Sequence, residues 1–112
     1  MPELPIEISP ADTKALLDKA DAAVRLIDCR EEDEWRICRI EGATLIPLSH
    51  FAEEASSKLQ NTDQHLIFYC HHGMRSLRAT HWLRQKGFAS TQSMAGGIEA
   101  WSDSVDPTTP RY

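Results

Sequence analysis

Short apolar runs alternate with segments of helical periodicity along this chain, and this alternation strongly limits the folds open to it. Residues 24–28, 44–46, 66–70 and 91–94 have the length and composition of strands, and residues 6–8 could add a short first one. Residues 66–70 form the most apolar run, which predicts the central strand. Strands separated by helices pair in parallel and are covered on both faces. The pattern therefore predicts an α/β domain with a mainly parallel sheet of about five strands.

The segments between the runs contain helix signals. Ser9 before Pro10 predicts the start of a first helix, with Ser9 as its N-cap. Residues 31–35 predict a short acidic helix, Ser49 predicts the cap of the next helix, and residues 98–101 predict a last short one. Gly87 followed by Phe88 predicts a helix stop, after a helix that begins near Arg75. The helix positions expected to share the buried faces are Thr13, Leu16, Leu17, Ala20, Phe51, Ala55, Leu59, Ala79, Trp82 and Leu83.

Length and composition narrow the class of protein. A chain of 112 residues can bury one core, so we expect a single domain over residues 1–112, with an aperiodic closing tail at 102–112. Its 17 acidic and 12 basic residues disfavour nucleic acid as a partner. No apolar run approaches the ~18 residues of a membrane span, and the first five residues lack signal-peptide features. Three cysteines without C-x-x-C spacing disfavour a disulfide framework and a zinc knuckle, so we expect a cytoplasmic protein without a membrane partner.

The segment most informative about chemistry is Tyr-Cys-His-His-Gly-Met-Arg-Ser at residues 69–76. It places Cys70 at the carboxyl end of the predicted central strand, before a tight loop and a helix. Unpaired N–H groups at the helix start, together with Arg75, are expected to lower the pKa of Cys70 and make it nucleophilic. Gly73 permits the turn in which successive N–H groups converge. The segment predicts a reactive-anion site, whereas an inert buried thiol is the alternative for Cys70 alone.

His71 and His72 follow the candidate nucleophile directly. Adjacent residues rarely point at each other, so we expect backbone N–H groups and exposed imidazoles rather than a Cys–His dyad. A metal held by Cys70 and the two histidines is disfavoured by their spacing, so no metal site is predicted.

Polar residues also follow the strand predicted at residues 24–28. Asp28 and Arg30 could form an ion pair that supports the loop after Cys70, or a structural pair within a turn. The sequence favours neither interpretation over the other, and the two are compatible. Either Cys29 or Cys38 could be a resolving thiol, but the sequence favours a role in core packing, or simple surface exposure, for both cysteines.

Several motifs resemble one known family. Cys-x-x-Gly-x-Arg-Ser at residues 70–76 resembles the active-site loop of rhodanese-like sulfurtransferases. Residues 26–31 resemble the family's hydrophobic-hydrophobic-Asp-x-Arg element, and residues 94–101 its Gly-Gly-x-x-x-Trp signature. Residues 40–47 resemble its His-Ile-Pro-Gly-Ala stretch, although Arg39 and Glu41 replace the His and the Pro. Residues 101–102 and 105–112 resemble the closing segment of rhodanese-like domains fused to adenylyltransferases that load sulfur-carrier proteins.

The resemblance implies a three-layer α/β/α sandwich and a ping-pong reaction without a cofactor. Cys70 would take a sulfane sulfur from a donor such as thiosulfate, and the resulting persulfide would pass it to cyanide or a thiol. Arg75 would complement the leaving sulfite or hold the loop. The other loop residues would bind the substrate: His71, His72, Gly73, Met74 and Ser76. The acceptor could be a sulfur-carrier protein or a thioredoxin-like protein.

Two other functions are weighed against sulfur transfer. Cell-cycle dual-specificity phosphatases share this fold but have five residues between Cys and Arg. Here four residues separate Cys70 from Arg75, so the ring of donors suits a sulfur atom better than a phosphate. A non-catalytic binding module of this family usually lacks the cysteine, whereas this chain keeps Cys70, Gly73 and Arg75.

Overall fold

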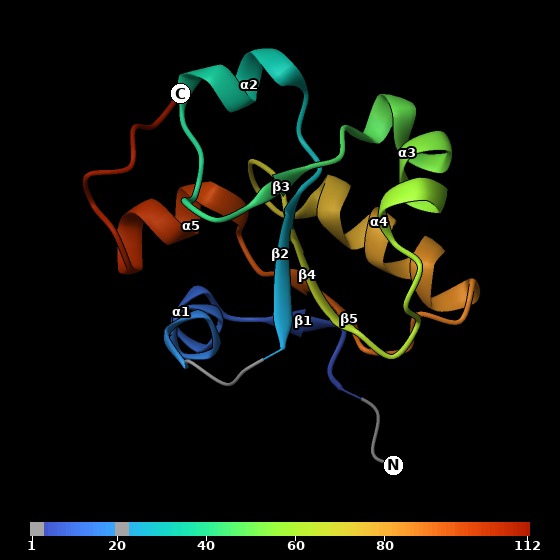
Figure 1. Cartoon of the computed structure of the whole chain (residues 1–112). Helices are drawn as coiled ribbons and strands as arrows, with labels where there is room; N and C mark the ends of the chain where they lie inside the picture. The colour runs from blue at the N-terminus through green and yellow to red at the C-terminus, as the bar shows by residue number, and fades with distance from the viewer. Residues whose placement is uncertain (1–3, 20–22) are drawn as a thin grey trace.

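A five-stranded parallel sheet lies between two layers of helices in the computed structural model, which describes residues 4–19 and 23–112 (Figure 1). The strand order is β1-β5-β4-β2-β3, and every described strand pair is parallel. The apolar run predicted as the central strand is β4, in the middle of the sheet. The strands are β1 (Glu7–Ile8), β2 (Val24–Asp28), β3 (Thr44–Leu45), β4 (His65–Tyr69) and β5 (Thr91–Met94).

The helices complete a three-layer sandwich, as expected. Residues of α1 (Pro10–Asp18) and α5 (Gly97–Ser104) pack on one face of the sheet. Residues of α3 (Phe51–Lys58) and α4 (Met74–Gln85) pack on the other. The short helix α2 (Glu32–Ile37) lies at the carboxyl end of the strands, near the end of the chain (Figure 1). Within residues 4–19 and 23–112, no helix is both long enough and apolar enough to cross a bilayer.

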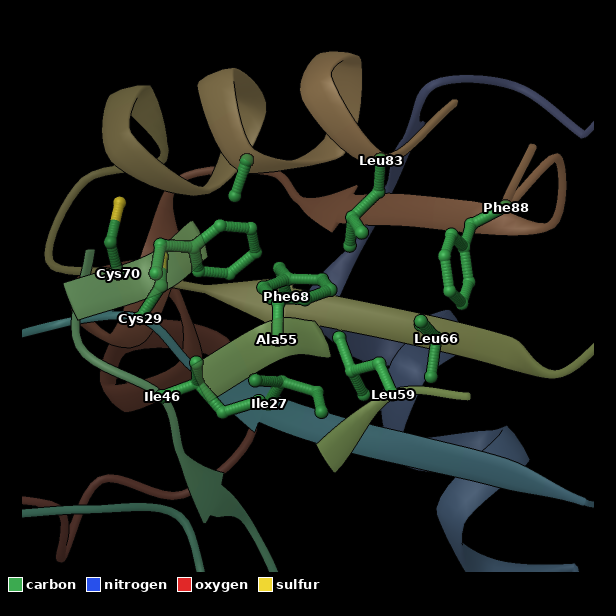
Figure 2. Close-up of a cluster of buried hydrophobic side chains, with 12 residues drawn as sticks. Ile27, Cys29, Ile46, Ala55, Leu59, Leu66, Phe68, Cys70, Leu83 and Phe88 are labelled. Atoms are coloured by element: carbon green, nitrogen blue, oxygen red, sulfur yellow. The ribbon is translucent and has the colours of Figure 1, made fainter. Parts of the chain in front are cut away.

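Alternation along the strands builds two separate cores. Leu66 and Phe68 of β4 face α3 and α4 (Figure 2). Ile67 and Tyr69 face α1 and α5 instead, and all four side chains are fully buried. Each buried large side chain contributes about 1.5–3 kcal/mol relative to an exposed one. A strand buried on both faces has to be apolar throughout, which explains the run at β4.

Two helix boundaries follow the sequence signals. The Ser9 hydroxyl accepts a hydrogen bond from the Asp12 N–H at 3.0 Å and caps α1 as expected. Gly87 has a φ of +98°, and the Phe88 N–H donates to the Leu83 carbonyl at 3.0 Å, so the predicted stop after α4 is confirmed.

Other details differ from the expectations. Ser49 does not cap α3, because a 3₁₀ turn (Leu48–His50) precedes that helix and the Ser49 hydroxyl donates to Glu31 instead. Trp82 was expected on the buried face of α4, but it is 36% exposed, and its ring meets only the edge of the core through an edge-on contact with Phe51. The last helix was expected to end at residue 101, but α5 continues to Ser104, and its buried side includes Trp101. The first three residues of the tail expected at 102–112 are therefore helical. Ala20 lies outside the described residues.

Candidate active site

Cys70 follows β4 directly, and α4 begins four residues later at Met74. The turn between them depends on Gly73, the N-cap of α4, whose φ is +106°. A Cβ at this position would lie 3.2 Å from the backbone nitrogen of Gly96, the N-cap of α5, so the glycine also permits close packing against the start of α5. This strand–loop–helix arrangement is the one the sequence predicted for Cys70.

Hydrogen-bond donors converge on the Cys70 sulfur. The Gly73 N–H lies 3.1 Å from Sγ, and the Ser76 N–H lies 3.4 Å from it. The Ser76 Oγ is 3.5 Å from the same sulfur and 2.7 Å from the Ser93 Oγ. The Ser76 Oγ also lies 3.2 Å from the Gly73 carbonyl oxygen, so when Ser93 is the donor to Ser76, the Ser76 proton is shared between that oxygen and the Cys70 sulfur. The predicted cluster of N–H donors at the helix start is confirmed, and a pair of serine hydroxyls extends it.

These contacts stabilise the thiolate of Cys70. Its pKa is lowered to about 4, first by the neighbouring Cys29 thiol, then by the Ser76 side chain and by the Ser76 and Gly73 N–H groups. Burial acts in the opposite direction and raises the pKa, but the hydrogen bonds outweigh it. A pKa of about 4 favours the thiolate of Cys70 at neutral pH, and thiolates are the nucleophilic form of cysteine.

Cys29 is completely buried beside Cys70. The Cys29 thiol donates a hydrogen bond to the Tyr69 carbonyl oxygen, with Sγ 3.4 Å from it. The pKa of Cys29 is raised well above its ordinary value, first by its interaction with the Cys70 side chain, then by burial and by the Cys70 charge. Cys29 is buried in the core, as a packing residue would be, but its position beside the candidate nucleophile was not anticipated.

Arg75 forms a two-point ion pair with Glu34 of α2, with N–O distances of 2.6 and 2.8 Å. From the sequence, the Arg75 guanidinium was expected to stabilise the Cys70 thiolate. In the structure, the guanidinium instead donates its hydrogen bonds to the Glu34 carboxylate, which the sequence did not single out. Its charge still acts through space, because the Cys70 thiolate is among the causes that raise the pKa of Arg75. Of the two roles considered for Arg75, this contact favours holding the loop.

Asp28 and Arg30 form a completely buried ion pair, with a shortest N–O distance of 2.7 Å. The Arg30 N–H also donates to Asp28, as in a structural turn. In addition, the Arg30 guanidinium donates to the Cys38 carbonyl at 2.6 Å and to the Tyr112 hydroxyl at 2.9 Å. The ion pair is thus present, and its link toward the loop runs through Tyr112 at the end of the chain.

The remaining loop side chains lie on the rim of the site. His72 is exposed, and its Nε2 lies 2.7 Å from a Glu99 carboxylate oxygen. His71 stacks between His72 and Tyr112, with ring centroids 3.9 and 4.0 Å away. Burial and the neighbouring His72 lower the pKa of His71. Met74 is 77% exposed and is available to a substrate or partner.

One group of potential metal ligands lies at this rim. Ligand atoms of His71, His72 and Glu99 lie within 4.8 Å of one another. The two imidazole rings are stacked, however, with their planes only 21° apart, so their nitrogen lone pairs lie in nearly parallel planes that do not converge on one point. Ligands to one ion have to converge on it, and at least one ring would have to rotate before both histidines could bind.

The start of α5 fastens the loop. The Ile98 N–H donates to the Cys70 carbonyl at 2.8 Å, and the Glu99 N–H donates to the His71 carbonyl at 3.2 Å. A Cβ on Gly97 would collide with both of those carbonyl oxygens. The Gly-Gly pair at this point therefore allows α5 to approach the loop closely enough to bond it.

Sequence reasoning missed several residues of the site. Ser93 had a weak signal, because a small hydroxyl in a buried strand needs a hydrogen-bond partner. Glu34 looked like any other residue of an acidic helix, and Glu99 and Tyr112 reach the loop only through the fold.

Comparisons with known proteins agree with this architecture. A family model described as Rhodanese-like domain matches residues 9–104. Adenylyltransferase and sulfurtransferase MOCS3-2 of Zea mays is 36% identical over 110 residues, covering 94% of this chain and 23% of that protein. Thiosulfate sulfurtransferase GlpE of Pseudoalteromonas translucida is 35% identical over 94 residues, covering 84% of this chain and 86% of that protein. The structure of the human single-domain sulfurtransferase TSTD1 matches with a TM-score of 0.77 and 27% identity, covering 90% of this chain and 98% of that one.

Several curated relatives are much longer than this chain, which spans only 23% to 30% of their length. The expected resemblance is confirmed by the family match and by the parallel sheet between helix layers. The chain belongs to the rhodanese-like domain family, whose members include proteins named as sulfurtransferases.

Proposed function

We propose that this protein is a sulfurtransferase that carries a sulfane sulfur on Cys70. The observation that most supports this proposal is the Cys70 sulfur itself, which is held as a thiolate by the Gly73 and Ser76 N–H groups and by neighbouring side chains. A pKa of about 4 provides the nucleophile at neutral pH without a separate general base.

The first half-reaction forms a persulfide. The Cys70 thiolate attacks the outer sulfur of thiosulfate, a new S–S bond forms, and the bond to the inner sulfur breaks to release sulfite. The terminal persulfide sulfur is also anionic, so the Gly73 and Ser76 donors are suited to stabilise it as they do the thiolate. Arg75, tied to Glu34, keeps the start of α4 in position.

The second half-reaction regenerates Cys70. A nucleophilic acceptor, such as cyanide in an assay or a cellular thiol, attacks the terminal sulfur, and the thiolate leaves. For the cellular acceptor we propose a sulfur-carrier or thioredoxin-like protein. The similarity to a protein named as both adenylyltransferase and sulfurtransferase, over 94% of this chain, favours a sulfur carrier. The exposed Met74 and His72 on the rim are the residues such a partner would meet first.

The test is intact-mass analysis of the reduced full chain after treatment with thiosulfate. We expect one added sulfur atom per chain, mapped to Cys70 and removed by cyanide with release of thiocyanate. Cys70→Ser should gain none. Cys38→Ser is the matched control, because Cys38 is a buried cysteine in the other core, and it should behave like the unmodified chain.

Three outcomes would contradict the proposal. Added sulfur that persists in Cys70→Ser would place the reactive cysteine elsewhere. Cys70-dependent hydrolysis of an aryl phosphate, without turnover of thiosulfate, would favour the phosphatase alternative instead. Absence of both activities in a correctly folded chain would favour a binding module.

A further inference from the structure

The sheet register brings two of the three cysteines together. Strands β2 and β4 pair in parallel with Asp28 opposite Tyr69, and the Cys29 N–H continues the ladder by donating to the Tyr69 carbonyl at 3.0 Å. Cys29 and Cys70 are therefore the next residues of adjacent strands. Neighbouring strands lie about 4.8 Å apart. That spacing falls within the roughly 4.4–6.8 Å between Cα atoms that a disulfide can bridge.

Both side chains lie on the same side of the sheet. Strand alternation places Cys29 with Ile27 and Cys70 with Phe68, and all four belong to the core under α3 and α4 (Figure 2). Cys38 belongs to the core on the opposite face. The fold thus pairs Cys70 with Cys29 and separates it from Cys38.

The two thiols differ in pKa, and therefore in their reactivity toward an oxidant. Cys70 is the thiolate, whereas Cys29 stays protonated, partly because of the negative charge on Cys70. An oxidant therefore reacts first at Cys70. Oxidation removes the Cys70 charge, and with it one of the causes that raise the pKa of Cys29. Cys29 becomes easier to ionise at the moment its neighbour becomes an electrophile.

We propose that Cys29 is a resolving thiol, which joins Cys70 in an intramolecular disulfide after a hydroperoxide has oxidised Cys70. In the first step the Cys70 sulfur attacks one peroxide oxygen, an S–O bond forms, the O–O bond breaks, and hydroxide (or an alkoxide) leaves. In the second step the Cys29 sulfur attacks the Cys70 sulfur, the S–O bond breaks, and the sulfenic hydroxyl leaves with the thiol proton as water. The peroxide gains the two electrons that the thiols lose, and a cellular dithiol reverses the bond by exchange.

The consequence is protection of the nucleophile. A sulfenic acid without a resolving partner proceeds to sulfinic and sulfonic acids, which dithiols do not reduce. A disulfide with Cys29 stops that sequence and keeps Cys70 recoverable. The inference does not depend on the proposed sulfur transfer, because it rests on the placement of Cys29 and Cys70.

Peptide mapping of the unmodified chain provides the test. Trypsin cuts after Lys and Arg, and the three cysteines fall in three separate peptides: residues 26–30, 37–39 and 59–75. The reduced full chain is treated with hydrogen peroxide, blocked with an alkylating agent and digested without reductant. We expect the peptides 26–30 and 59–75 to be linked and 37–39 to be alkylated. Sulfinic acid at Cys70 without the linked pair, or a link to 37–39, would overturn the proposal.

Variants provide a second readout. Cys29→Ser should accumulate Cys70 sulfinic acid and fail to recover a free Cys70 thiol after dithiothreitol. Cys38→Ser should form the disulfide and recover as the unmodified chain does. A Cys29→Ser chain that recovers fully would also contradict the proposal. Thiosulfate loading of the unoxidised chain is measured separately, so failure of the resolving role and failure of sulfur transfer can be told apart.

Discussion

At the scale of single residues, the Cys70 charge is stabilised by fixed protein groups in place of water. The residue is 1% exposed, so without these groups burial would favour the neutral thiol. The N–H groups of Gly73 and Ser76 could be anticipated, since any helix start presents them. The thiol of Cys29 and the Ser76–Ser93 pair could not, because strand register brings them to the sulfur.

The lowered pKa of Cys70 predicts an unusual pH profile for alkylation. Because the folded-state pKa is about 4, the thiolate is already formed at pH 5, so the rate with iodoacetamide should be nearly constant from pH 5 to 8. Below about pH 4 the rate should fall as the thiolate is protonated. Modification is followed on the peptide of residues 59–75, which contains only this cysteine.

The unfolded chain is the internal control for this profile. In urea, Cys70 should titrate near its ordinary value of about 8.5. A folded-state rate that rises about tenfold per pH unit between pH 5 and 8 would identify an ordinary thiol and remove the basis for the proposed nucleophile.

At the scale of elements, the loop keeps its shape because the start of α5 bonds its carbonyl groups. The Ile98 and Glu99 N–H groups reach Cys70 and His71, and this approach is open only because position 97 has no Cβ. The elements on either side of the loop are β4 and α4, so α5 adds a third support from later in the chain.

Gly97→Ala is therefore predicted to disturb the loop. The variant has two costs: a left-handed φ of +64°, and a collision with the Cys70 and His71 carbonyl groups. We expect a loss of unfolding free energy of more than about 2 kcal/mol, since the backbone conformation alone costs about 1–2 kcal/mol. The alkylation rate of Cys70 at pH 6 should fall as well.

Gly42→Ala is the matched control. Gly42 has a φ of +88°, but a Cβ there would meet no atom within 4 Å. It should therefore incur only the backbone cost and leave Cys70 alkylation unchanged. If Gly97→Ala and Gly42→Ala lower the unfolding free energy equally and leave the alkylation rate of Cys70 equally unchanged, the close approach of position 97 to the loop carbonyl groups does not matter for the site.

At the scale of the whole molecule, the Glu34 carboxylate connects three distant segments. It belongs to α2, pairs with Arg75 at the start of α4 and accepts the Tyr112 hydroxyl at 2.7 Å. These contacts lower the pKa of Glu34 to about 2, first through the Arg75 hydrogen bond. Tyr112 in turn stacks on His71 and contacts Arg30, so the end of the chain lies against the rim of the site (Figure 1).

Glu34→Gln is predicted to destabilise the fold by about 1 kcal/mol at pH 7, a value that allows for solvent screening of a partly exposed pair. A lowered pKa stabilises the fold above the ordinary glutamate value of about 4.3. That stabilisation is lost as the pH falls toward 2. The difference in urea-unfolding free energy between the two chains should therefore shrink from pH 4 to pH 2. A difference that is unchanged at pH 2 would mean that the charge of Glu34 is not its cause.

The sequence alone determined the features that depend on local chemistry and periodicity. An apolar run predicted β4, a serine cap and a glycine stop predicted helix ends, and a cysteine before Gly73 predicted a helix-start anion site. These signals need only a few neighbouring residues. Only the tertiary structure decided that Arg75 binds Glu34, that Ser93 supports Ser76 and that Cys29 lies beside Cys70. Those pairings are set by parallel register and helix packing, which bring together residues 17 to 41 positions apart along the chain.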